Sequence, residues 1–131
     1  MHLDTLLIIS NNPLVDTINN ISIIQVEGSS IQVLSAAMNH AAEGYHLLSH
    51  PLASSVKPNQ NPYRSVLLAK KMGAVDLSSL KILHLALIKT EEILHESWAC
   101  DQCSRYADDY QFLDYSLMKN AVESMIERGE A

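Results

Sequence analysis

The sequence lacks several features that would narrow its function at once. It has no Walker motif and no GxGxxG pattern, so neither standard nucleotide-binding fold is supported. It has no GxSxG nucleophile elbow. No apolar run approaches the roughly 18 residues of a membrane helix, and no basic segment precedes the apolar run near the N-terminus. We therefore expect no membrane span, no signal peptide and a cytoplasmic location.

Positive charge is scarce and unevenly placed. The net charge is −6, and residues 1–56 contain no Lys or Arg. Residues 57–90 carry six bases against a single acid, Asp76, whereas residues 91–131 are strongly acidic. An acidic protein is a poor non-specific binder of nucleic acid. The central basic segment predicts either charge pairing with the acidic C-terminal part or a site for an anion.

Alternating hydrophobic patterns predict a single α/β domain of 131 residues. The expected strands are 5–10, 21–26, 45–49 and 65–69, and the expected helices are 13–19, 31–41, 77–98 and 108–128. We expect a mainly parallel sheet of about four strands in the order 2-1-3-4, in a Rossmann-like three-layer arrangement. The direction of the fourth strand is open. The two C-terminal helices would cover the sheet or form part of a homo-oligomer interface.

Helical periodicity and capping residues predict which side chains face inward and where helices begin. Asn11 or Asn12 before Pro13, Ser29 or Ser30, and Asp76 are the expected helix caps. Inward-facing positions in the two C-terminal helices are Leu80, Leu83, Leu87, Leu94 and Trp98, then Phe112, Tyr115, Val122 and Met125.

Polar residues gather where three expected strands end, and a long loop with three prolines follows the third strand. In open α/β sheets, ligands bind outside the carboxyl ends of the strands. A hydroxyl-rich loop with Lys and Arg, facing a helix start, suits a phosphate or carboxylate. The expected ligand-binding residues are Asn11, Asn12, Gly28, Ser29, His50, Ser54, Ser55, Lys57, Asn59, Tyr63 and Arg64. The alternative is that these residues only form turns.

The sequence indicates a catalytic site or a metal site less clearly than it indicates a ligand-binding site. His50 could act as an acid/base with a nearby serine, but no motif fixes such a pair. Cys100 and Cys103 form a CxxC pattern with His95 nearby, which gives three ligands where structural zinc usually takes four. Reduced thiols without metal or disulfide are the simpler interpretation. We expect no metal and no cofactor.

Four segments resemble the GrdX family. They are Asn11-Asn12-Pro13-Leu14-Val15, Val26-Glu27-Gly28, the run from His46 to Asn59 (HLLSHPLASSVKPN), and Pro62-Tyr63-Arg64-Ser65-Val66. The resemblance extends over nearly the whole chain. It implies a small protein associated with the glycine, sarcosine or betaine reductase system of anaerobic bacteria that ferment amino acids. The family carries no established activity or catalytic residues that would transfer to this chain.

Together these features predict an accessory or regulatory protein that binds a small anionic or amino-acid-like ligand at the strand ends. Glycine, betaine or an acyl phosphate would suit such a site. Two alternatives stay open. One is a small enzyme that acts on a phosphorylated or acylated metabolite through His50. The other is a module that docks onto a glycine reductase component through its acidic helices.

Overall fold

A computed structural model describes residues 5–18, 21–50, 62–70, 74–96 and 107–127. Within these ranges the chain forms a four-stranded sheet, one 3-10 helix and three α-helices. In chain order the elements are β1 (Leu6–Ser10), η2 (Pro13–Thr17), β2 (Ser22–Gln25), α1 (Ser30–Ala42), β3 (Tyr45–Leu47), β4 (Ser65–Lys70), α2 (Leu77–Glu96) and α4 (Ala107–Glu127). The predicted α/β class and the predicted order of elements along the chain are therefore confirmed.

The sheet is mixed rather than mainly parallel, so this part of the prediction was wrong. Its strand order is β2-β1-β4-β3, with β4 antiparallel to both β1 and β3. The predicted order placed the third strand beside the first. Burial explains the difference, because β4 is fully buried from Ser65 to Ala69, whereas the three residues of β3 are only half-buried. The more apolar strand takes the central position and the short one lies at the edge.

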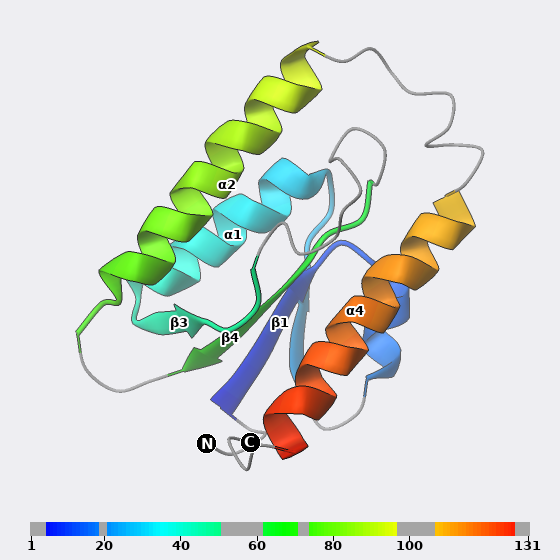
Figure 1. Cartoon of the computed structure of the whole chain (residues 1–131), viewed down its shortest axis with the longest axis horizontal. Coiled ribbons are helices and arrows are strands. Elements are labelled where there is room, and N and C mark those ends of the chain that lie inside the picture. The colour runs from blue at the N-terminus through cyan, green and yellow to red at the C-terminus, as the bar shows by residue number, and fades with distance from the viewer. Residues whose placement is uncertain (1–4, 19–20, 51–61, 71–73, 97–106, 128–131) are drawn as a thin grey trace.

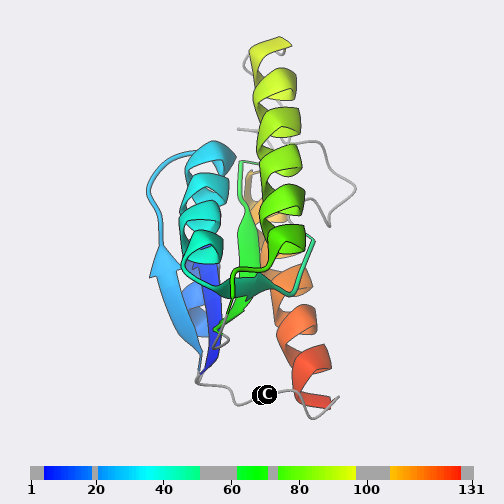
Figure 2. The same ribbon diagram turned by 90° about the vertical axis from the view of Figure 1, so that its left-hand side faces the viewer.

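Helices cover both faces of the sheet (Figure 1). Alternate residues of β1 and β4 face opposite ways, so each strand contributes to two cores. Leu7 and Ile9 pack with α1 and α2, and Leu6 and Ile8 pack with η2 and α4. Figure 2 looks onto the sheet from the side of α1 and α2, which lie in front of the strands, and α4 lies behind them. The three-layer arrangement of helices about a sheet is thus present, with a mixed strand pattern.

The predicted caps are found at three helix starts. Asn12 caps η2, where its side chain accepts a hydrogen bond from the Leu14 N–H. Ser29 caps α1 in a capping box with Gln32. Asp76 precedes α2 and accepts hydrogen bonds from the backbone of Ser78 and from Ser79. No helix in the described part of the chain combines the length and apolar character needed to cross a membrane.

The inward face of α4 differs from the predicted one. Phe112 is 63% exposed, whereas Met118 is 4% exposed and Val122 is also buried. The prediction for Phe112 was therefore wrong. The buried positions Asp114, Met118 and Val122 recur four residues apart, as expected for one face of a helix. Because Asp114 is charged, this face looked less apolar in the sequence than the face that contains Phe112.

This assignment of the α4 face is tested by two substitutions on one helix. Met118→Ala should lower the free energy of unfolding by about 2–5 kcal/mol, because it leaves a cavity in the core under β4. Phe112→Ala should change it by less than about 0.5 kcal/mol, because the ring is mostly in solvent. Urea denaturation of both variants measures the difference. Equal losses from the two substitutions would contradict the assignment.

Candidate functional site

The carboxyl ends of β1 and β2 lie at the same edge of the sheet, where Ser10 pairs with Gln25. β2 is parallel to β1, and β3 runs the same way as β1 because both are antiparallel to β4. The carboxyl end of β3 lies nearer the opposite edge, because Leu47 pairs with Leu68, which is level with Leu7 of β1. The predicted meeting of three strand ends is therefore wrong for β3.

β4 begins at the edge where β1 and β2 end, with Ser65, directly after Arg64. We call this edge the strand-end rim. At this rim Arg64 lies next to Asn11, although 53 positions separate the two residues in the sequence. Asn12 follows Asn11 at the same place.

Asn11 holds three chain segments together at the strand-end rim. Its Nδ2 donates to the carbonyl oxygen of Gly28 at 3.0 Å and to that of Pro62 at 2.8 Å. Its Oδ1 accepts from the backbone N–H of Arg64 at 2.8 Å. These three bonds use both amide hydrogens and the oxygen. Asn11 therefore fixes the position of Arg64 and has a structural role.

A buried polar network connects the start of β4 to α4. The carboxylate Oδ2 of Asp114 accepts hydrogen bonds from the Ser65 Oγ at 2.6 Å and the Asn12 Nδ2 at 3.0 Å. The Ser10 Oγ lies 2.8 Å from the Ser65 Oγ and accepts from the Asn12 N–H. All four side chains are at most 7% exposed. The network ties α4 to the strand-end rim.

Gly28 and Ser29 serve the start of α1. Gly28 has φ of 120°, and a Cβ atom there would lie 2.9 Å from the side-chain oxygen of Gln32. Glycine is therefore required for the backbone and for space. The Ser29 hydroxyl accepts from the Ile31 N–H, and Gln32 accepts from the Ser29 N–H. These two predicted site residues thus complete the helix cap.

Arg64 differs from the other predicted site residues described above, because their polar groups are hydrogen-bonded within the protein. Its side chain is only 3% exposed, and among the described residues neither Nε nor Nη2 has a hydrogen-bond partner. Burial lowers the pKa of Arg64, and the negative charge of Asp114 partly opposes that effect. A buried guanidinium with unpaired donors carries a large desolvation cost. Native proteins seldom leave such donors unused, so this one is a candidate for ligand binding.

His50 lies apart from the Asp114 network. It lines an open hollow of about 200 Å³ together with Ile82, Leu85 and Ala86 of α2. α2 covers the face of the sheet opposite to the face that carries α4 and Asp114. His50 therefore has mainly apolar residues beside it in this hollow.

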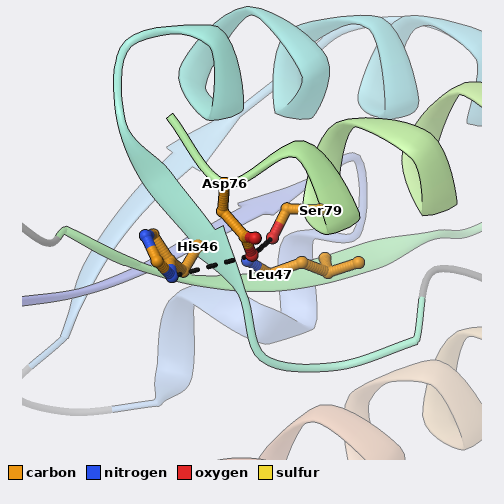
Figure 3. Close-up of polar contacts among 4 residues, drawn as sticks. All are labelled: His46, Leu47, Asp76 and Ser79. Carbon is orange, nitrogen blue, oxygen red and sulfur yellow. Dashed lines mark hydrogen bonds and ion pairs between the residues drawn. The ribbon is translucent and has the colours of Figure 1, made fainter. Parts of the chain in front are cut away.

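A second polar cluster joins β3 to the start of α2 (Figure 3). The Ser79 Oγ donates to Asp76 Oδ2 at 2.6 Å and accepts from the Leu47 N–H at 2.9 Å. His46 Nδ1 lies 3.7 Å from the same carboxylate oxygen. The pKa of Asp76 is lowered, chiefly by the Ser79 hydrogen bond and further by His46 and backbone N–H groups. The cluster caps α2 and fastens the edge strand to it.

Sequence reasoning missed Ser10, Ser65 and Asp114. Asp114 carried a usable signal, because it lies on the same helical face as Met118 and Val122 and so was a charge on a buried stripe. Tyr63 is half-buried beside Arg64 in sequence. The remaining predicted site residues, Ser54, Ser55, Lys57 and Asn59, lie outside the described residues, as do Cys100 and Cys103. Within the described ranges, no three His, Cys, Asp or Glu side chains are grouped to hold a metal ion.

Comparison with known proteins gives one result. The family model GrdX, described as GrdX-like protein, matches residues 7–123. The matched range includes the whole sheet except Leu6, the first residue of β1, and it includes most of α4. Searches of curated proteins and of solved structures found no match.

The Asp76 cluster predicts a pH-dependent contribution to stability. The folded-state pKa of Asp76 lies below its ordinary value of 3.8, so the contribution is present above that pH. It is lost as the pH falls through the lowered pKa. Asp76→Asn should therefore be less stable than the parent protein at pH 7, and the gap should narrow as the pH falls below 3.8.

Urea denaturation at pH 7, 4 and 3 measures this gap. Glu123→Gln, at an exposed acid of α4, is the matched control and should show little effect at any pH. A gap for Asp76→Asn that stays constant between pH 7 and pH 3 would contradict the assignment.

Proposed function

Because the chain belongs to the GrdX-like protein family, we propose that it is an accessory or regulatory protein of the glycine reductase system. We further propose that it binds a small anionic or amino-acid-like ligand at the strand-end rim. The family match supports the first part. The second part is supported by Nε and Nη2 of Arg64, which are buried and have no hydrogen-bond partner within the described part of the chain.

Arg64 is held in place for such a role. The Asn11 side chain accepts from the Arg64 backbone N–H at 2.8 Å, and the Asn11 N–H donates to the Arg64 carbonyl oxygen at 3.3 Å. The next residue, Ser65, is hydrogen-bonded to Asp114. The backbone on both sides of the guanidinium is therefore tied to β1 and α4. A side chain on a fixed backbone loses less entropy when a ligand binds.

Ligand binding also accounts for the energetics of Arg64. An unsatisfied buried polar group costs about 1–3 kcal/mol, and a charged one costs more. An anion that accepted hydrogen bonds from Nε and Nη2 would offset this cost and add a charge-assisted interaction. The other predicted binding residues at the rim already use their polar groups within the protein. Arg64 is thus the residue through which the ligand would be held.

The proposal predicts thermal stabilisation by small anions that depends on Arg64. A ligand at about a hundred times its dissociation constant should stabilise the folded protein by roughly 2.7 kcal/mol. Glycine, sarcosine, betaine and acetyl phosphate are the probes, and differential scanning fluorimetry is the measurement. At least one probe should raise the melting temperature by several degrees. Arg64→Ala should abolish that rise.

Lys70→Ala is the matched control, because Lys70 is an exposed base at the opposite end of the same strand. It should keep the full ligand-dependent rise. Two results would contradict the proposal. One is the absence of stabilisation by any probe, and the other is an equal rise in the parent protein and in Arg64→Ala.

A further inference from the structure

We propose that copies of this chain assemble head to tail, with the outer face of α2 in one copy packed against α4 of the next copy. The surfaces involved lie outside the strand-end rim, so this inference does not depend on the proposed ligand. Three observations carry it. They are the apolar side chains that both helices leave exposed, the order of the charges beside them, and an apolar hollow next to α2.

The outer face of α2 carries apolar side chains between two charges. Leu85 is 55% exposed and Ile88 is 38% exposed, although the other side of this helix packs in the core. Lys81 and Glu92 are also exposed, one turn before Leu85 and one turn after Ile88. Positions i, i+4, i+7 and i+11 lie on one face of a helix. We call these four residues the α2 row.

α4 repeats this spacing with the two charges in the reverse order. Phe112 is 63% exposed, and its ring centroid lies 6.1 Å from that of Tyr115, which is half-buried. Asp108 and Lys119 are exposed one turn before and one turn after these rings. We call Asp108, Phe112, Tyr115 and Lys119 the α4 row. The α2 row thus begins with a base and ends with an acid, and the α4 row does the opposite.

The two rows are complementary when the helices lie parallel to each other. Each charge then faces one of opposite sign, and the apolar positions meet between them. None of these four charged side chains forms an ion pair with another described residue. The four contacts are Lys81 with Asp108, Leu85 with Phe112, Ile88 with Tyr115, and Glu92 with Lys119.

The hollow beside α2 favours this contact over a contact between two α2 rows. It has a volume of about 200 Å³, and Leu85 lines it together with His50, Ile82 and Ala86. A large exposed aromatic side chain suits an apolar hollow, and Phe112 would enter it from the facing helix. Two α2 rows packed together would leave the hollow without an aromatic group and would leave Phe112 in solvent.

Charge disfavours a contact between two α4 surfaces. The exposed charges of α4 in the described part of the chain are three acids, Asp108, Asp109 and Glu123, and one base, Lys119. Two such surfaces repel each other. The exposed lysines and glutamates of α2 balance, two against two, so α2 is the better partner for α4. These residues are Lys81, Lys89, Glu91 and Glu92.

The fold makes this assembly head to tail. α2 packs on one face of the sheet and α4 on the other (Figures 1 and 2), so a chain cannot pair its own two rows. Each copy instead offers its α2 row to one neighbour and its α4 row to another. A contact between two different patches builds a ring or an open chain and does not close as a symmetric dimer.

Sedimentation velocity of the parent protein over a wide range of concentration tests the assembly. The average mass should rise with concentration and should pass that of a dimer. A parent protein that stays monomeric over the whole range, or that stops at a closed dimer, would overturn the proposal.

Two single substitutions test whether the contact joins different patches. Leu85→Asp alters only the α2 row and Phe112→Asp only the α4 row, and both residues are exposed, so the fold should be kept. Each variant alone should be monomeric. Their equimolar mixture should form a one-to-one pair that grows no further, because each variant keeps a different intact row. Leu117→Asp, at an exposed position outside the α4 row, is the matched control and should assemble as the parent does.

The same experiment identifies the symmetric alternatives. Association that survives Leu85→Asp but not Phe112→Asp would mean that α4 pairs with α4, and the converse would mean that α2 pairs with α2. Either result would overturn the proposal. A mixture in which no pair forms would also overturn it.

A charge exchange tests the parallel alignment without changing an apolar residue. Lys81→Asp and Asp108→Lys should each weaken the association several-fold, because like charges then face each other. The two substitutions combined in one chain should restore it. Asp109→Lys, at the same helix end but outside the α4 row, is the matched control and should weaken the association less than Asp108→Lys does. A combined variant that associates no better than the single ones would overturn the proposed pairing.

Discussion

The antiparallel pairing of β4 with β1 is the interaction on which the rest of the structure depends. It sets Ser65 opposite Ser10 and Ala69 opposite Leu6. Because side chains alternate along a strand, this register sends Leu67 to the core under α4 and Val66 and Leu68 to the core under α1 and α2. A shift by one residue would exchange the two faces. It would also separate the Ser10 hydroxyl from the Ser65 hydroxyl, which binds Asp114.

The same pairing builds the strand-end rim. β4 enters the sheet where β1 and β2 leave it, so the residue before β4 arrives beside two strand ends. Asn11 then fastens Arg64, and Asp114 fastens Ser65. The result is a buried guanidinium at the strand-end rim whose Nε and Nη2 have no hydrogen-bond partner among the described residues. An anion that accepted hydrogen bonds from these two nitrogens would offset the cost of burying them.

The sequence was enough to predict the elements but not how the strands pair. The strands and the caps at Asn12, Ser29 and Asp76 follow from local patterns, and the structure confirms them. The position of β4 is non-local, because it depends on which strand buries the most apolar surface. Arg64 was predicted as a binding residue from its charge and position. Its burial, and the lack of a hydrogen-bond partner for Nε and Nη2 within the described ranges, appear only once β4 and α4 are placed.

The central claim is that the Arg64 guanidinium binds the carboxylate of a small anionic or amino-acid-like ligand. A crystal structure determined in the presence of excess glycine tests it most directly. The account predicts glycine with its two carboxylate oxygens within hydrogen-bond distance of Nε and Nη2. A structure in which Nε and Nη2 are bonded only to water or to groups of the protein, with glycine absent from the rim, would contradict it.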